Sequence, residues 1–285
     1  TYLQVNAEGL IDLKELEAAI KPTTILISIM YANNEIGTIQ PIREISAIAR
    51  KNGVLLFTDA TQAVGKIPVD VNTDGIDLMA FTSHKMYGPK GIGALYVRRK
   101  NPRVKVTAQM DGGGHERGMR SGTLNVPGIV GFGKACELCM QDMEEDNKRI
   151  IKMRDRLETE LLKLEEAYVN GSREHRLPHV SNISFKHVEG EGLLMGFNKN
   201  IALSSGSACT SASLEPSYVL KALGLGDDLA HRSLRFGLGR FTTEDQIDYT
   251  VKSISETVLK LREMSPLWEM YKEGIDLNTI EWAAH

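Results

Sequence analysis

The 285-residue chain is long enough for one large domain or two moderate ones. Its 42% hydrophobic and 25% charged residues are ordinary for a globular protein with a packed core, and its net charge of −3 provides no overall positive field to attract nucleic acid. No apolar run is long enough to cross a bilayer, and the first residues, Thr1–Gln4, resemble neither a signal peptide nor a transit peptide.

The first half of the chain alternates short apolar runs with amphipathic stretches. This pattern predicts a βαβ arrangement around a largely parallel sheet, in which chemistry gathers at the carboxyl ends of the strands. We expect one helix at Ile42–Lys51 and strands at Thr24–Met30, Val54–Thr58, Asp77–Phe81 and Ala94–Val97.

The pattern changes after the last of these strands. Five glycines between Met110 and Thr123 make a regular element unexpected there. From about Ile129 to Tyr168, apolar residues recur at helical spacing among charged ones, which predicts a long helix with one packed face. The remainder mixes the two kinds of element, as in an α+β domain, with strands at Val180–Phe185 and Ile201–Ser204 and helices at Pro216–Leu223 and Thr243–Met264.

Three of the predicted strands in the first half end in polar residues. The first leads into Asn33-Asn34-Glu35, the second into Asp59-Ala60-Thr61-Gln62, and the third into Thr82-Ser83-His84-Lys85. Each residue has an ordinary structural explanation, since Asp59 fits a helix N-cap, His84 a satisfied core histidine and Lys85 a solvated surface lysine. Their occurrence at three successive strand ends favours a shared crevice.

The residues of this crevice meet the requirements of pyridoxal phosphate (PLP). That cofactor needs a lysine amine for its Schiff base and a carboxylate that keeps the pyridine nitrogen protonated. It also needs donors for its phenolate oxygen and small polar groups around its phosphate. Lys85 and Asp59 fit the first two roles, Gln62 and Asn34 the third, and the group Thr82, Ser83 and His84 the fourth.

Cysteine usage points to one reactive thiol. Three cysteines in this length argue against a disulfide scaffold and suit a reducing compartment. Cys136 and Cys139 form a CxxC that could be a redox pair or half a zinc site, but they lie in a helical run without a second CxxC, which favours buried small apolar residues. Cys209 lies among small residues in 204–213, which favours an exposed nucleophile over a linker that happens to hold a cysteine.

These motifs resemble the cysteine desulfurases of the NifS/IscS class, and the resemblance covers essentially the whole chain. It is carried, in order along the sequence, by Asn33–Gly37, Asp59–Gln62, Ser83–Lys85, Glu116–Thr123, Ser204–Ser213 and the closing Ser265–Met270, which is similar to the IscS branch with its mitochondrial members. Because relatives begin earlier, the resemblance implies that a segment at the N-terminus is missing here.

The resemblance implies a fold type I PLP-dependent transferase that forms homodimers. It divides the chain into a PLP-binding large domain over 1–142, N-terminally incomplete, and a smaller α+β domain over 143–285, with the Cys209 loop at 204–213 and a partner-binding tail at 265–285. It implies that Lys85 carries the cofactor, that His84 assists it, and that Thr123 reaches the phosphate of the neighbouring subunit. Arg235, with Asn34, is expected to hold the substrate carboxylate.

The implied reaction converts L-cysteine to L-alanine and leaves the sulfur on Cys209 as a persulfide. The acceptor in this branch is typically an iron–sulfur scaffold protein, in the bacterial cytoplasm or the mitochondrial matrix. No metal site is expected, and Cys209 would contact an iron–sulfur cluster only transiently. Two alternatives are a selenocysteine lyase and a non-catalytic subunit that binds scaffold proteins.

Overall fold

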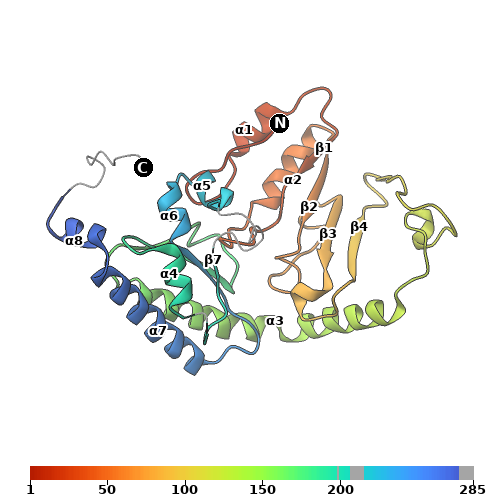
Figure 1. Cartoon of the computed structure of the whole chain (residues 1–285). Coiled ribbons are helices and arrows are strands. Elements are labelled where there is room, and N and C mark those ends of the chain that lie inside the picture. Colours follow the sequence, from red (N-terminus) through yellow and green to blue (C-terminus); the bar gives the residue numbers. More distant parts are fainter. Residues whose placement is uncertain (198, 206–214, 276–285) are drawn as a thin grey trace.

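The computed structural model describes residues 1–197, 199–205 and 215–275. Two separate sheets are joined by one long helix, and Figure 1 shows the sheets on opposite halves of the molecule. In the part of the chain that is described, no helix is both long enough and apolar enough to traverse a membrane.

The first sheet has the strand order β1-β2-β3-β4. Its elements and the helices around it are α1 (Leu13–Ala19), β1 (Leu26–Ser28), α2 (Ile42–Lys51), β2 (Leu55–Asp59), β3 (Leu78–Thr82), the 3₁₀ turn η1 (Ser83–Met86), β4 (Gly93–Val97) and the short 3₁₀ turn η2 (Glu116–Gly118). A core of apolar side chains from α2 and the three parallel strands, with Ile45 and Leu56 fully buried, holds this half together.

The prediction of a largely parallel sheet is correct, with one antiparallel strand at the edge that the sequence did not indicate. β1 pairs with β2 and β2 with β3 in parallel, whereas β4 pairs with β3 in antiparallel fashion, Thr82 facing Gly93. The chain reverses direction through η1 and the following turn, so there is no crossover helix between β3 and β4, and a parallel pairing requires one. The sheet is therefore mixed.

The second sheet is antiparallel throughout, with the order β5-β6-β8-β7. Its half of the molecule contains β5 (Ala167–Val169), β6 (Val180–Phe185), α4 (Gly190–Met195), β7 (Ser204–Ser205), α5 (Tyr218–Ala222), α6 (Asp227–His231), β8 (Ser233–Gly237), α7 (Glu244–Glu263) and α8 (Pro266–Lys272). Trp268 and Tyr271 of α8 pack against His187, with ring centroids 5.7 and 4.7 Å from that imidazole.

The long helix α3 (Val126–Leu161) belongs to both halves. Near its start, Phe132 and Cys139 pack with Met86 of η1, and further along Met153 and Leu157 enter the core of the second half. The helix begins before the predicted residue because the side chain of Asn125 accepts a hydrogen bond from the Gly128 amide, an N-cap followed by proline.

The other end of α3 also differs from the prediction, because the predicted helix over Ile129–Tyr168 includes the start of a strand. The helix stops at Leu161, since Ala167–Val169 pair with β6 instead. Tertiary pairing therefore overrides the helical periodicity of the last turns.

The CxxC on α3 faces the interior of the first half. Cys139 is 3% exposed and Cys136 is half-buried, and burial raises the pKa of both thiols. Among the described residues, no cluster of histidine, cysteine and acidic side chains could hold a metal ion. The interpretation of these cysteines as small buried residues agrees with this packing.

Candidate active site

The carboxyl ends of the parallel strands β1, β2 and β3 lie along one edge of the first sheet. β2 ends at Asp59, which faces Ala80 in β3, and β3 runs directly into the turn that carries Lys85. β1 leads to the turn that contains Asn34. Asp59 and Lys85 therefore follow adjacent parallel strands at the same edge, where open α/β sheets bind their ligands.

Asp59 and Gln62 occupy the turn after β2. Asp59 is exposed, and its Oδ1 accepts a hydrogen bond of 2.9 Å from the Thr61 amide. This local bond holds the carboxylate at the end of the strand, as in an Asx turn. Gln62 is half-buried one residue further on.

The turn after β3 exposes the predicted lysine. Lys85 and His84 are exposed, and the Nδ1 atom of His84 lies 3.0 Å from the Thr82 hydroxyl. Ser83 is fully buried instead, with its hydroxyl against Gly88 inside the turn and without a hydrogen-bond partner in the described structure. Thr82 and His84 are thus better placed than Ser83 to meet a phosphate.

The turn after β1 is organised by Asn33. Its Oδ1 accepts hydrogen bonds from the amides of Glu35 (2.8 Å) and Ile36 (3.1 Å), and Gly37 completes the turn at a φ of +76°. These two hydrogen bonds, from backbone amides to the side chain of Asn33, fix the backbone on both sides of Asn34. The half-buried Asn34 is therefore held in a defined position at the edge of the sheet.

Arg235 reaches this turn from the second sheet. It lies on β8, and its Nη1 donates to the carbonyl oxygen of Asn34 at 3.0 Å while its Nη2 donates to the hydroxyl of Ser204 at 3.1 Å. The two residues predicted to bind the substrate carboxylate are thus in direct contact, although they are 201 positions apart in the chain.

Two further predicted residues are not joined to this group by the structure. Thr123 is exposed in the segment between η2 and α3. Its predicted contact is with a neighbouring subunit. Cys209 lies outside the described residues, so its role stays a prediction.

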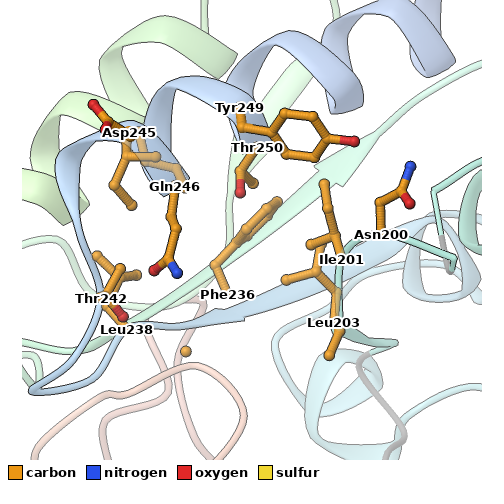
Figure 2. A pocket seen from close by; sticks show the side chains of 14 residues that line it. Asn200, Ile201, Leu203, Phe236, Leu238, Thr242, Asp245, Gln246, Tyr249 and Thr250 are labelled. Carbon is orange, nitrogen blue, oxygen red and sulfur yellow. The ribbon is translucent and has the colours of Figure 1, made fainter.

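A hollow in the second half is lined by none of the predicted residues. It has a volume of about 490 Å³. Figure 2 shows Ile201, Leu203 and Phe236 on its apolar side and Gln246 and Tyr249 of α7 beside them. Its lining includes polar side chains but no lysine, so the sheet edge is the better candidate for a Schiff base.

Comparison with known proteins identifies the family of the chain. A model of the aminotransferase class-V family matches residues 1–250. The chain is 58% identical to cysteine desulfurase IscS of Escherichia coli O139:H28 (strain E24377A / ETEC), over 100% of this chain and 70% of that protein. The chain belongs to the class-V aminotransferases and groups with their cysteine desulfurases.

Solved structures support the same family assignment. A NifS-like protein superposes with a TM-score of 0.83 at 35% identity, covering 92% of this chain and 68% of that one. The NifS-like protein from Rickettsia africae ESF-5 superposes with a TM-score of 0.81 at 32% identity, covering 90% and 68% respectively. The predicted fold class, an α/β transferase of fold type I with a partial large domain, is confirmed.

Class-V aminotransferases depend on PLP, and the residues present here fit that cofactor. The sheet edge offers an exposed lysine amine, an exposed carboxylate at the end of the neighbouring strand, and a hydroxyl–imidazole pair. These are the chemical groups that a Schiff base, a pyridinium nitrogen and a phosphate require.

The prediction from the sequence assigned no role to three residues around Arg235. The Ser204 hydroxyl accepts a hydrogen bond from Arg235. The Ser217 hydroxyl donates a hydrogen bond to Glu35, whose carboxylate is within reach of the charge of Arg235. Glu35 was visible as an acidic residue directly after an apolar strand, and Ser217 as a serine before a helical run. Neither sequence feature indicates with which residue the side chain forms a hydrogen bond.

Proposed function

We propose that this chain catalyses the conversion of L-cysteine to L-alanine and carries the released sulfur as a persulfide on Cys209. The observation that carries the proposal is the position of Lys85 and Asp59, a lysine and a carboxylate at the ends of adjacent parallel strands. The cysteine desulfurases among the relatives support the choice of reaction.

Four kinds of contact would hold the cofactor. Lys85 would bind it covalently through Nζ, and Asp59 would pair with the ring nitrogen. Gln62 and Asn34 would lie near the phenolate oxygen, and Thr82 and His84 would hold the phosphate together with Thr123 of the neighbouring subunit in a homodimer, while the buried Ser83 would shape the turn. When bound, PLP supplies an electron-withdrawing ring that stabilises negative charge on the substrate α-carbon.

Arg235 would orient the substrate. Its guanidinium is pinned on one side to the Asn34 carbonyl, so its remaining N–H groups are presented in a fixed direction. A bidentate contact with the cysteine carboxylate would aim the substrate α-carbon at the amine of Lys85, which, with His84 beside it, would accept the α-proton at Nζ.

Cys209 would complete the reaction as a thiolate. Its sulfur attacks the sulfur of the substrate, an S–S bond forms as the C–S bond breaks, and the carbon fragment takes up a proton and leaves as alanine. The protein thiol becomes a persulfide, so that the sulfur is conserved between substrate and enzyme. An iron–sulfur scaffold protein would then accept this sulfur, with the tail 265–285 as its binding segment and the bacterial cytoplasm or mitochondrial matrix as the setting.

The test of the proposal is alanine formation from L-cysteine by the PLP-loaded protein, with persulfide detected by mass spectrometry. L-Selenocysteine serves as the comparison substrate. We expect alanine from cysteine together with a sulfur adduct on the protein. Alanine from selenocysteine alone would indicate a selenocysteine lyase, and alanine from neither would contradict the assignment as an enzyme.

Replacing Arg235 with alanine is expected to raise the KM for cysteine roughly 10- to 100-fold, since a charge-assisted bidentate bond is lost. Steady-state kinetics over a range of cysteine concentrations measure the change. Arg156 provides a matched control, because it also contacts two oxygen acceptors, Glu244 and Asp248, but on the exposed surface of the second half. A KM that is unchanged in Arg235→Ala would show that another group holds the carboxylate.

A further inference from the structure

The turn after β1 is held by hydrogen bonds from three separate elements of the second half. Arg235 of β8 donates to the Asn34 carbonyl at 3.0 Å, and Asn182 of β6 donates through Nδ2 to the Glu35 carbonyl at 3.3 Å. Ser217, directly before α5, donates its hydroxyl to Oε2 of Glu35 at 2.5 Å. Two adjacent residues, Asn34 and Glu35, thus form one junction between the halves, in addition to the continuous helix α3.

The carboxylate of Glu35 is buried in this junction. Glu35 is only 5% exposed, and the loss of solvent raises its pKa against the opposing effects of the Ser217 hydroxyl and the charge of Arg235. The next residue, Ile36, belongs to a buried apolar cluster with Leu220 of α5. A buried carboxylate is unfavourable unless a partner satisfies it, and the Ser217 hydroxyl supplies that partner here, separately from the bonds of Arg235 and Asn182 to the backbone of the turn.

Glu35 also determines how the Ser217 hydroxyl is oriented. Ser217 is the N-cap of α5, and its Oγ accepts a hydrogen bond from the Leu220 amide at 3.4 Å. A serine hydroxyl has a single proton, and here it points to Glu35. With its donor and its acceptor capacity both used, Ser217 is fixed at 4% exposure.

Both flanks of the segment that contains Cys209 are connected to this same turn. Ser204 precedes residues 206–214, and its hydroxyl is held by Arg235, which also binds Asn34. Ser217 follows that segment and is held by Glu35. The chain therefore enters and leaves the Cys209 segment at points fixed to Asn34 and Glu35.

We propose that Glu35 is a positioning residue for sulfur transfer: through Ser217 it fixes the point from which the Cys209 segment extends, relative to Asn34 and Arg235. This inference rests on the proposed desulfurase function. It predicts that Glu35 acts on the step that needs Cys209 and leaves the binding of cysteine, which Arg235 provides, largely unchanged.

The test compares Glu35→Ala, Ser217→Ala and the double variant as PLP-loaded full chains. We expect each single variant to slow persulfide formation on Cys209 in a single turnover by about tenfold. The KM for cysteine should change less than about twofold, and the cofactor absorption band should remain. Because one bond joins the two side chains, the double variant should be no slower than the slower single variant. Glu35→Gln, which keeps a side-chain acceptor for Ser217, should restore most of the rate.

The matched control is Ser181→Ala. Ser181 also donates to a buried carboxylate, Oε1 of Glu158, at 2.7 Å, but this pair lies inside the second half. We expect Ser181→Ala to transfer sulfur at the wild-type rate, and thermal melting of every variant separates loss of folding from loss of positioning.

Three results would overturn the role of Glu35. They are a normal rate of persulfide formation in Glu35→Ala, losses that multiply in the double variant, or an equal loss in Ser181→Ala. Hydrogen exchange of the amides of α5 gives a readout independent of activity, and faster exchange in Glu35→Ala without slower transfer would assign Glu35 a structural role only. A wild-type protein that forms no alanine from cysteine would instead contradict the proposed function itself.

Discussion

Replacing Lys85 with alanine is expected to abolish the visible absorption band of bound PLP and to lower desulfuration by about a thousandfold or more, because the residue supplies both the covalent attachment and the proton-accepting amine. Absorption spectroscopy after incubation with PLP and gel filtration measures the attachment. An alanine-release assay measures the rate.

Two variants control the Lys85 experiment. Lys85→Arg keeps the positive charge but has no primary amine, so it should lose the band as completely as the alanine variant does. Lys90, which is exposed a few residues further along, offers a matched lysine, and Lys90→Ala should keep band and activity. A band that persists in both Lys85 variants would place the cofactor on another residue.

Replacing Cys209 with serine is expected to remove persulfide formation on the protein and to lower alanine formation about a hundredfold or more, while the cofactor band stays intact. A serine hydroxyl is not ionised near neutral pH and is a poor nucleophile toward sulfur. Mass spectrometry of the peptide that contains residue 209 after a single turnover detects the added sulfur directly.

The other cysteines are the controls for Cys209. Burial raises the pKa of Cys136 and of Cys139, which keeps both as thiols. Cys136→Ser should therefore transfer sulfur as the wild type does. An adduct on Cys136 or Cys139, with normal turnover in Cys209→Ser, would remove Cys209 from the mechanism.

Local patterning was enough to predict most of the elements that build the sheet edge. Ile42–Lys51 and Val180–Phe185 have the predicted bounds: the first buries its amphipathic face, and the second is buried along its whole length. The direction of β4 was not predictable in this way, since a run as short as Gly93–Val97 fits a strand of either direction. The turn through η1 determines that direction.

The candidate site was predictable where it follows strand ends and unpredictable where it depends on the second half. Asp59 and Lys85 follow the strands that the apolar runs identified. The contact of Arg235 with Asn34 required knowledge of how β8 lies against the first turn, which no local pattern contains. Ser83 illustrates a further limit: its neighbours Thr82 and His84 are accessible, but the turn buries its hydroxyl against Gly88.

The helix α3 has a consequence for dissecting the protein. The boundary predicted between residues 142 and 143 falls within its continuous stretch from Val126 to Leu161, and the same helix supplies Phe132 to one apolar core and Met153 to the other. A cut at that boundary would divide α3 into two shorter helices. Each fragment would then have to pack its apolar core against only part of the original helix. The two halves therefore share helix α3, and a fragment for separate study has to keep this helix intact.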